Sequence, residues 1–213
     1  MYGPIPGSIG WNNLPATGLA ANFLNETMDE LEKLRLEAEY VFKEAKLLYS
    51  PDEIETVIER MAKEITVVLE DKNPVVLCLM IGAVIVIGKL LPRLNFPLQL
   101  EYVHATRYQG TTGGNIQWVR SPSIALENRT VLIVDDILDE GITLSSIIEE
   151  CRRLNAAKIY TAILADKQIK KRRPLEKADF TGLTVPDRYV FGYGMDYKGY
   201  LRNAPGIYAV TKL

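Results

Sequence analysis

Three aspartates gather at one end of an apolar run in the stretch VLIVDDILDEGITL, residues 131–144. Asp135 and Asp136 directly follow four apolar residues, and Asp139 comes shortly before Gly141. The glycine permits a tight turn into a helix, whose N-terminus carries partial positive charge and suits a phosphate group. Carboxylates suit sugar hydroxyls or Mg²⁺ instead. A ribose 5-phosphate beside a metal ion would match both halves of this stretch.

The elements expected to position these acids form a parallel sheet. Continuous apolar runs predict buried strands, and strands that alternate with helices favour an α/β protein. Ligands of open parallel sheets bind beyond the carboxyl ends of the strands, where Asp135 and Asp136 are expected. The strands expected from these runs are Pro74–Met80, Thr130–Val134 and Ala157–Ala165, and a helix is expected over Thr143–Leu154.

Further elements are predicted on either side. The first two dozen residues are rich in Gly, Pro and Asn and are expected to be irregular. Apolar residues at helical spacing predict a helix from Leu31 to Tyr49. Ser50-Pro51-Asp52-Glu53 contains the signals of a capping box and starts a second helix. A helix through Leu91 and strands over 96–106 and 115–120 complete the prediction.

Composition excludes several classes of protein. With 213 residues, 47% of them hydrophobic, the chain can build one sizeable core with a small flap. A net charge of −2 argues against a general nucleic-acid binder. The sequence has no apolar run of membrane-spanning length and no basic-then-apolar N-terminus, so a cytoplasmic protein without membrane contact is expected. Cys78 and Cys151 lie in apolar patterns and are expected as buried free thiols.

The stretch 131–144 resembles the phosphoribosyl pyrophosphate signature of the type I phosphoribosyltransferases. Residues 185–208, VPDRYVFGYGMDYKGYLRNAPGIY, resemble the purine-binding segment of the hypoxanthine-guanine phosphoribosyltransferases, and ILADK at 163–167 resembles their strand that ends in a lysine. The resemblance extends from about Ser50 to the C-terminus. It implies a Mg²⁺-dependent purine salvage transferase that makes IMP or GMP and releases pyrophosphate.

The resemblance also implies roles for the acidic stretch. Asp135 and Asp136 would hold the ribose hydroxyls, directly or through Mg²⁺. Asp139 would also accept the proton of purine N7 while N9 becomes the nucleophile. The cradle for the 5-phosphate would consist of Asp139, Glu140, Gly141, Ile142 and Thr143.

Roles at the purine and pyrophosphate follow from the same resemblance. Lys167 would donate to the 6-oxo group, which favours 6-oxopurines over adenine because adenine presents an amine there. Tyr189 would stack on the purine, and the Val190 carbonyl would meet its 2-position. Asp196 matches a second Mg²⁺ position, and Arg202 matches a pyrophosphate contact.

Two segments depart from the family pattern. Residues 107–115 resemble its mobile catalytic loop, in which Tyr108 matches a serine-tyrosine pair and Arg107 replaces the serine. After the 74–80 strand, much of the family has Lys-Gly-Gly, which contacts pyrophosphate through a strained peptide. Here Ile81-Gly82-Ala83 lacks the lysine charge, so pyrophosphate is expected to bind the backbone N–H groups at Ile81 and Gly82.

The predicted architecture is a mostly parallel sheet flanked by helices, with a small hood formed by N- and C-terminal segments. Its parts are an arm and helical extension over 1–50, a core over 51–170 and a purine-binding hood over 171–213. Two alternatives stay open: preference for xanthine, and a non-enzymatic regulator of the same fold. A homodimer or homotetramer is implied by the resemblance. His104, the solvated run 170–173, Trp118 and Tyr197 are expected to have structural or surface roles.

Overall fold

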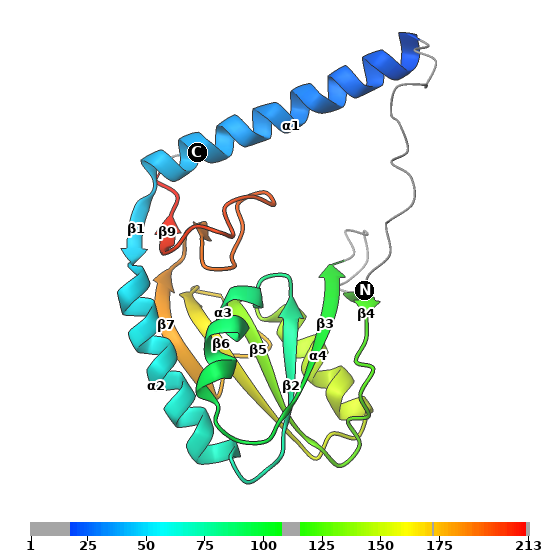
Figure 1. Ribbon diagram of the computed structural model, residues 1–213, viewed down its shortest axis with the longest axis vertical. Coiled ribbons are helices and arrows are strands. Elements are labelled where there is room, and N and C mark those ends of the chain that lie inside the picture. Colours follow the sequence, from blue (N-terminus) through cyan, green and yellow to red (C-terminus); the bar gives the residue numbers. More distant parts are fainter. Residues whose placement is uncertain (1–17, 108–115, 172, 212–213) are drawn as a thin grey trace, which may run out of the picture.

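The computed structural model describes residues 18–107, 116–171 and 173–211. A six-stranded sheet in the order β4-β3-β2-β5-β6-β7 forms the body, and a three-stranded sheet in the order β1-β9-β8 lies beside it (Figure 1). Neighbours in the large sheet are parallel except β3 and β4. The large sheet contains β2 Val75–Met80, β3 Gln99–Arg107, β4 Ile116–Arg120, β5 Thr130–Leu138, β6 Lys158–Gln168 and β7 Phe180–Pro186. The small sheet contains β1 Lys46–Tyr49, β8 Val190–Phe191 and β9 Ile207–Ala209.

Helices cover both faces of the large sheet. Helices α2 and α3 lie on one face and α4 lies on the other, while α1 runs above the small sheet (Figure 1). The helices are α1 Gly18–Glu44, α2 Pro51–Leu69, α3 Val84–Leu90 and α4 Ile142–Arg153, and a 3₁₀ turn spans Leu91–Arg93. The expected α/β class with a mostly parallel sheet is confirmed.

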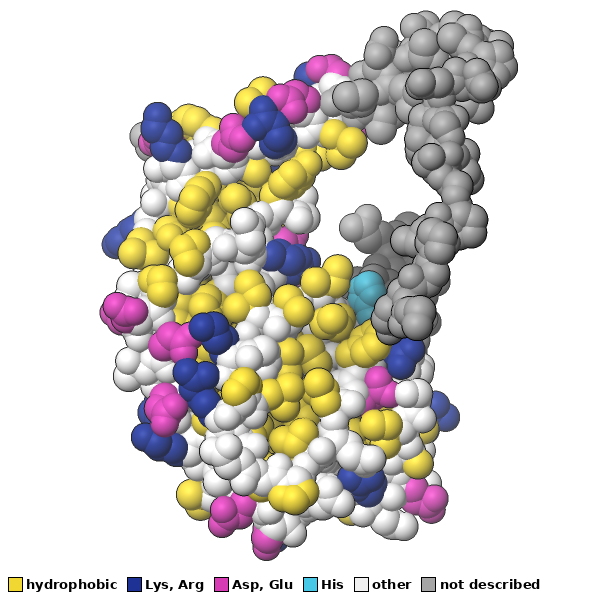
Figure 2. Space-filling view, viewed as in Figure 1, with side chains coloured by type: hydrophobic (Ala, Val, Ile, Leu, Met, Phe, Trp, Pro, Cys, Tyr) yellow, Lys and Arg dark blue, Asp and Glu magenta, His cyan; other side chains and the backbone are white. Residues whose placement is uncertain are grey.

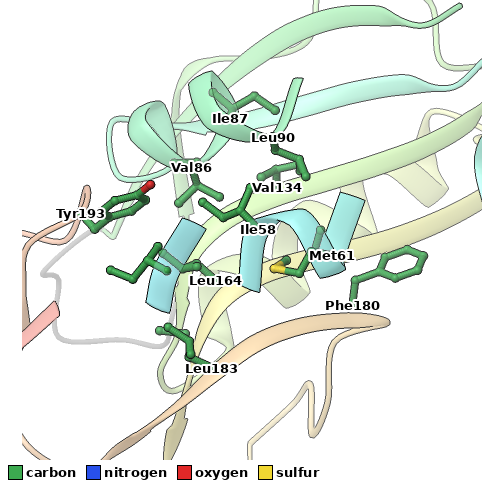
Figure 3. Packing of buried hydrophobic residues seen from close by; sticks show 14 of the residues in the cluster. Ile58, Met61, Val86, Ile87, Leu90, Val134, Leu164, Phe180, Leu183 and Tyr193 are labelled. Carbon is green, nitrogen blue, oxygen red and sulfur yellow. The ribbon is translucent and has the colours of Figure 1, made fainter. Parts of the chain in front are cut away.

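The alternation of side chains in the strands divides the core in two. In β5, Leu132 and Val134 pack toward α2 and α3, and Val131 and Ile133 pack toward α4. Figure 3 shows Ile58 of α2 within the first of these clusters. Because both faces are buried, the central strands have the continuous apolar runs seen in the sequence.

Helix α2 begins as its sequence predicts. The Ser50 hydroxyl accepts from the Glu53 backbone N–H at 3.4 Å, and the Glu53 carboxylate accepts from the Ser50 backbone N–H at 2.8 Å. Pro51 occupies the first helical position, where its missing N–H loses nothing. The predicted capping box is therefore confirmed, and it sets the residue at which α2 begins.

The helix predicted over Leu31–Tyr49 is wrong at both ends. Helix α1 begins at Gly18, within the stretch expected to be irregular, and ends at Glu44. Residues 46–49 form β1, which pairs antiparallel with β9 near the other end of the chain. Helical spacing continued through this segment by coincidence, and pairing with a strand about 160 residues away decides its conformation.

Strands β5 and β6 are longer than predicted. They continue past Val134 and Ala165 to Leu138 and Gln168, and Ile137 pairs with Ala165 in the extended part. In this extended part each strand supplies backbone hydrogen-bond partners to the other, so the polar residues there also adopt strand geometry. The acid pair consequently lies within β5 and not beyond its end.

The segments outside the core contribute to both sheets. The expected hood segment 171–213 supplies β7 to the large sheet and β8 and β9 to the small one. Cys78 and Cys151 are buried free thiols, as predicted. Across the described parts of the chain, the helices are too short or too polar to cross a membrane.

Candidate active site

A cleft of about 530 Å³ opens at the carboxyl ends of β2, β5 and β6, opposite the segment 189–202. It brings together most of the site residues predicted from the sequence. The predicted residues that line it are Ile81, Gly82, Asp135, Asp136, Asp139, Thr143, Lys167, Tyr189, Val190, Asp196 and Arg202. They come from three strands, the start of α4 and the hood, so the fold assembles them from segments far apart in sequence.

The acid pair lies on the floor of the cleft. The Asp135 carboxylate accepts from the backbone N–H of Asp136 at 2.9 Å, and the Asp136 side chain is buried. Burial raises the pKa of both carboxyls, and for Asp135 the neighbouring charge of Asp136 raises it further. Arg202 opposes this rise at Asp136 through its positive charge. Enclosed carboxylates of this kind are stabilised by hydroxyl donors or a cation.

Two glycines allow the hood and the turn after β2 to approach Asp136. A Cβ atom added at Gly82 would lie 2.3 Å from Oδ2 and 2.6 Å from Cγ of Asp136. Gly194 has φ +107°, and its added Cβ would lie 2.1 Å from the carbonyl oxygen of Gly82. Gly82 follows the peptide bond Met80–Ile81, which is cis. Ala83 and Val84 use their N–H groups within the turn, donating to the carbonyls of Leu79 and Ile81.

Lys167 and Asp139 meet at the purine end predicted for the cleft. The Lys167 ammonium lies 2.7 Å from Oδ2 of Asp139, and the lysine side chain is largely buried. Lys167 belongs to β6, and Asp139 follows β5, so the pairing of the two strands sets this distance. A donor and an acceptor therefore sit side by side at one wall of the cleft.

Arg173 supports this wall from outside the cleft, and the sequence did not predict this role. It belongs to the run 170–173 that was expected to be solvated, but its side chain is only 10% exposed. One guanidinium nitrogen donates to the carbonyl oxygens of Leu138, Asp139 and Lys167 at 3.1–3.3 Å. The other lies 2.5 Å from the Asp166 carboxylate. Arg173 belongs to a basic run and Asp166 follows the apolar run of β6, and nothing near either residue in the sequence indicates that they pair.

Arg202 and Asp196 face the cleft from the hood. They form an ion pair of 2.8 Å, and Arg202 also donates to the Gly194 carbonyl at 2.6 Å. The other carboxylate oxygen of Asp196 accepts from the Gly199 N–H at 2.7 Å. Tyr189 is 43% exposed, and its ring is free to present a face to a ligand.

Some predicted residues lie elsewhere. Glu140 and Ile142 line an adjoining hollow with Asp139 and do not line the cleft itself. Gly141 has φ +72° and caps α4, whose first turn points at the cleft through Thr143. The backbone of Arg107 ends β3, and its side chain is not described.

The expected catalytic loop lies outside the described residues for nearly its whole length, including Tyr108. His104 lines the cleft wall, and the structural or surface role expected for it stays a prediction. The predicted packing role of Tyr197 is confirmed, since its ring is buried against Phe191.

The donor set fits Mg²⁺ only in part. Carboxylate oxygens such as those of Asp135, Asp136 and Asp196 are ligands that Mg²⁺ prefers. Within the described ranges, no three His, Cys, Asp or Glu side chains converge as a ready-made metal site. Mg²⁺ is commonly held by one or two carboxylates together with substrate phosphates, and this arrangement suits that mode.

The geometry of the cleft suits one class of ligand. A buried acid pair, a helix N-terminus and a wall with a paired donor and acceptor suit a ribosyl phosphate joined to a flat base. Residues 46–198 match the family model described as "Phosphoribosyl transferase domain". The chain belongs to the phosphoribosyltransferase family, as its signature predicted.

Individual relatives show which members of this family the chain resembles. The chain is 36% identical to a hypoxanthine-guanine-xanthine phosphoribosyltransferase of Tritrichomonas foetus, over 76% of this chain and 89% of the relative. It is 32% identical to the hypoxanthine-guanine phosphoribosyltransferase of Bacillus subtilis, over 76% and 91%. A solved hypoxanthine phosphoribosyltransferase of Staphylococcus aureus has 26% identity and a TM-score of 0.75, over 81% of this chain and 95% of that one. The resemblance to this group of enzymes is therefore confirmed.

Proposed function

We propose that this enzyme converts hypoxanthine or guanine and phosphoribosyl pyrophosphate to IMP or GMP and pyrophosphate. The observation that carries the proposal is the Lys167–Asp139 pair beside Tyr189 in the cleft. The O6 and N7 atoms of a 6-oxopurine lie next to each other on one edge of the base. A lysine donor and a carboxylate acceptor 2.7 Å apart are spaced to meet that edge.

The same pair supplies proton transfer. Lys167 donates to O6, and the Asp139 carboxylate takes the proton from N7, which directs electron density to N9 for attack on the anomeric carbon. Tyr189 stacks on the base, and the Val190 carbonyl accepts from a 2-amino group when the base is guanine. Adenine would place an amine against the Lys167 ammonium and is disfavoured.

The ribosyl phosphate lies over the acid pair. Asp135 and Asp136 accept from the ribose hydroxyls, which offsets the unfavourable burial of their charges. The 5-phosphate occupies the turn from Asp139 to Thr143, where N–H groups and the Thr143 hydroxyl converge at the start of α4. This arrangement holds the anomeric carbon between the base and the leaving group.

The pyrophosphate leaves on the side of Arg202 and Gly82. Arg202 supplies positive charge, and the backbone at Ile81 and Gly82 supplies N–H donors, because Ala83 and Val84 already use theirs within the turn. Mg²⁺ held by Asp135, Asp136 or Asp196 with substrate oxygens would neutralise charge on the departing group.

The protein is proposed to act in the cytoplasm as a homodimer or homotetramer. Exposed apolar side chains gather over α3 and β3, and Figure 2 shows hydrophobic groups across the middle of this face. The exposed side chains of Val84, Leu100 and Tyr102 line one shallow hollow of this surface. Contiguous exposed apolar groups of this kind mark association surfaces. Sedimentation of the wild type and Leu100→Glu tests this, and a monomeric wild type would refute it.

Xanthine is the second candidate base, because a relative is named for activity on it. The comparisons do not favour the non-enzymatic regulator. The test supplies phosphoribosyl pyrophosphate and Mg²⁺ with hypoxanthine, guanine, xanthine or adenine in separate reactions and follows nucleotide formation. Asp139→Asn runs beside the wild type. Product from the 6-oxopurines and a large loss in the variant support the proposal, and no product from any of the bases would refute it.

A further inference from the structure

Helix α1 precedes the matched family region, which begins at residue 46, and yet it packs on the hood. Figure 1 shows α1 running above β9 and the segment that joins β8 to β9. Val41 of α1 is buried in a cluster with Phe191 and Tyr197. The segment that carries purine and pyrophosphate residues therefore has a neighbour that the family region does not supply.

Phe42 and Glu44, near the end of α1, contact the small sheet and a residue that closely follows β9. The Phe42 ring packs edge-on against Tyr208 at 5.2 Å and Phe191 at 6.2 Å. The Thr211 hydroxyl donates to the Glu44 carbonyl at 2.7 Å. These contacts attach the helix to the small sheet, away from the cleft.

Glu37 makes a different kind of contact, because it reaches the turn that borders the cleft. Its Oε1 accepts from the Tyr197 hydroxyl at 2.6 Å and from the Lys198 ammonium at 2.7 Å. The Tyr197 hydroxyl is the donor in this bond, so Glu37 is the group that holds it in place. The pKa of Glu37 is lowered, first by Lys198 and then by Tyr197, so it stays an acceptor.

The residues that Glu37 holds are the ones that contact Tyr189. The Tyr197 ring packs edge-on against the Tyr189 ring at 5.2 Å and 66°. The backbone N–H of Lys198 donates to the Tyr189 hydroxyl at 3.5 Å, a long contact. Both the ring and the hydroxyl of Tyr189 are thus supported by neighbours that Glu37 fixes. Asp196 lies in the same turn, one residue before Tyr197.

We propose that Glu37 is a positioning residue for the purine, acting through Tyr197 to hold the Tyr189 ring over the base. The inference rests on the proposed function, because it takes Tyr189 as the stacking residue. Glu37 touches no substrate, so it sets affinity for the base and leaves the ribosyl phosphate end unchanged. Helix α1 then contributes to purine binding through Glu37.

The test compares three single variants of the full chain. Glu37→Ala removes the acceptor, and Tyr197→Phe removes the donor while keeping the ring. Glu39→Ala is the matched control, since Glu39 is exposed on the same helix and pairs with Arg35 within it. The readouts are kcat and separate KM values for hypoxanthine and phosphoribosyl pyrophosphate, together with thermal melting.

Tyr197→Phe should raise KM for hypoxanthine by about fivefold, the size of one hydrogen bond of ordinary net strength. Glu37→Ala should raise it at least as much, because it also removes the acceptor of Lys198. KM for phosphoribosyl pyrophosphate should stay within about twofold. A double variant that combines the two changes should equal Glu37→Ala alone, because the Tyr197 hydroxyl has already lost its acceptor there. Glu39→Ala should match the wild type.

Other outcomes overturn one idea or the other. An unchanged hypoxanthine KM, or equal rises in both KM values, would show that Glu37 is only a structural contact. If Glu37→Ala unfolds, Tyr197→Phe decides the matter, because it leaves the packing of α1 in place. A wild type that forms no nucleotide from any purine would overturn the proposed function itself, which this series distinguishes from a failure of the inference.

Discussion

Replacing Arg173 by alanine should damage both stability and catalysis, although the residue does not line the cleft. Its ion pair with Asp166 is 2.5 Å long, and the two side chains are only 10% and 14% exposed. Alanine would leave the Asp166 carboxylate enclosed without this partner. Removing one member of a buried pair costs about 3–5 kcal/mol. The free energy of unfolding should fall by that amount, which is a large share of the ~5–15 kcal/mol typical of whole domains.

The catalytic effect follows from the carbonyl contacts. Arg173 holds the carbonyl oxygens of Asp139 and Lys167 through one guanidinium nitrogen. Without it the ends of β5 and β6 separate slightly, and the donor–acceptor wall is misplaced. A misplacement of about 1 Å can reduce turnover by on the order of 100-fold. We expect kcat/KM for hypoxanthine to fall between tenfold and roughly that limit.

Urea unfolding followed by circular dichroism measures the first effect, and initial rates measure the second. Lys171→Ala is the control, because Lys171 belongs to the same basic run and is exposed. Arg173→Lys should have intermediate stability and activity. An ammonium keeps the positive charge but lacks the planar set of N–H donors of a guanidinium. A loss below about 1 kcal/mol in Arg173→Ala, or an equal loss in Lys171→Ala, would refute the reasoning.

Three further outcomes are expected. Gly82→Ala should lower kcat/KM and reduce the free energy of unfolding by about 1–3 kcal/mol, because the new Cβ would collide with the short Asp136 side chain. Initial rates measure the first effect and urea unfolding measures the second. A fully active Gly82→Ala enzyme would contradict the close approach. Glu101→Gln should lower stability at pH 7 by up to about 3 kcal/mol, since Ser123 and other donors lower the Glu101 pKa from 4.5 to about 2. The deficit should close as pH falls from 4.5 toward 2, where the wild-type carboxylate is protonated, and urea titrations across that range would reveal a constant gap if this is wrong. Asp139→Asn should lower kcat for hypoxanthine by about 100-fold or more, with folding unchanged by circular dichroism, because it removes the proposed proton acceptor.

Local signals account for the elements that the sequence predicted well. The capping box at Ser50 depends on four consecutive residues, and the apolar run of β2 depends on burial over one short segment. The signature from Asp135 to Thr143 is likewise continuous, and it identified the family without any contact between distant segments. Such patterns can be predicted from the sequence because the residues that decide the local structure lie within a few positions of it along the chain.

Contacts between distant segments account for the rest. Residues 46–49 keep helical spacing but form β1, because β9 offers an edge to pair with. The strand extension that carries Asp135 and Lys167 depends on mutual pairing of β5 and β6. The neighbourhood of Asp139 and Lys167, 28 positions apart, was implied only by the family resemblance.

Residue types and their local order in this chain are enough to predict its chemistry: acids proposed for ribose, a turn proposed for phosphate, and a lysine and a tyrosine proposed for a purine. The tertiary structure alone decides which side chains support that chemistry. Arg173 and Glu37 are ordinary charged residues in ordinary surface patterns, and nothing nearby in the sequence marks their partners. Their roles arise because burial leaves a carboxylate or a hydroxyl that must be paired, and only the folded chain brings the pair within reach.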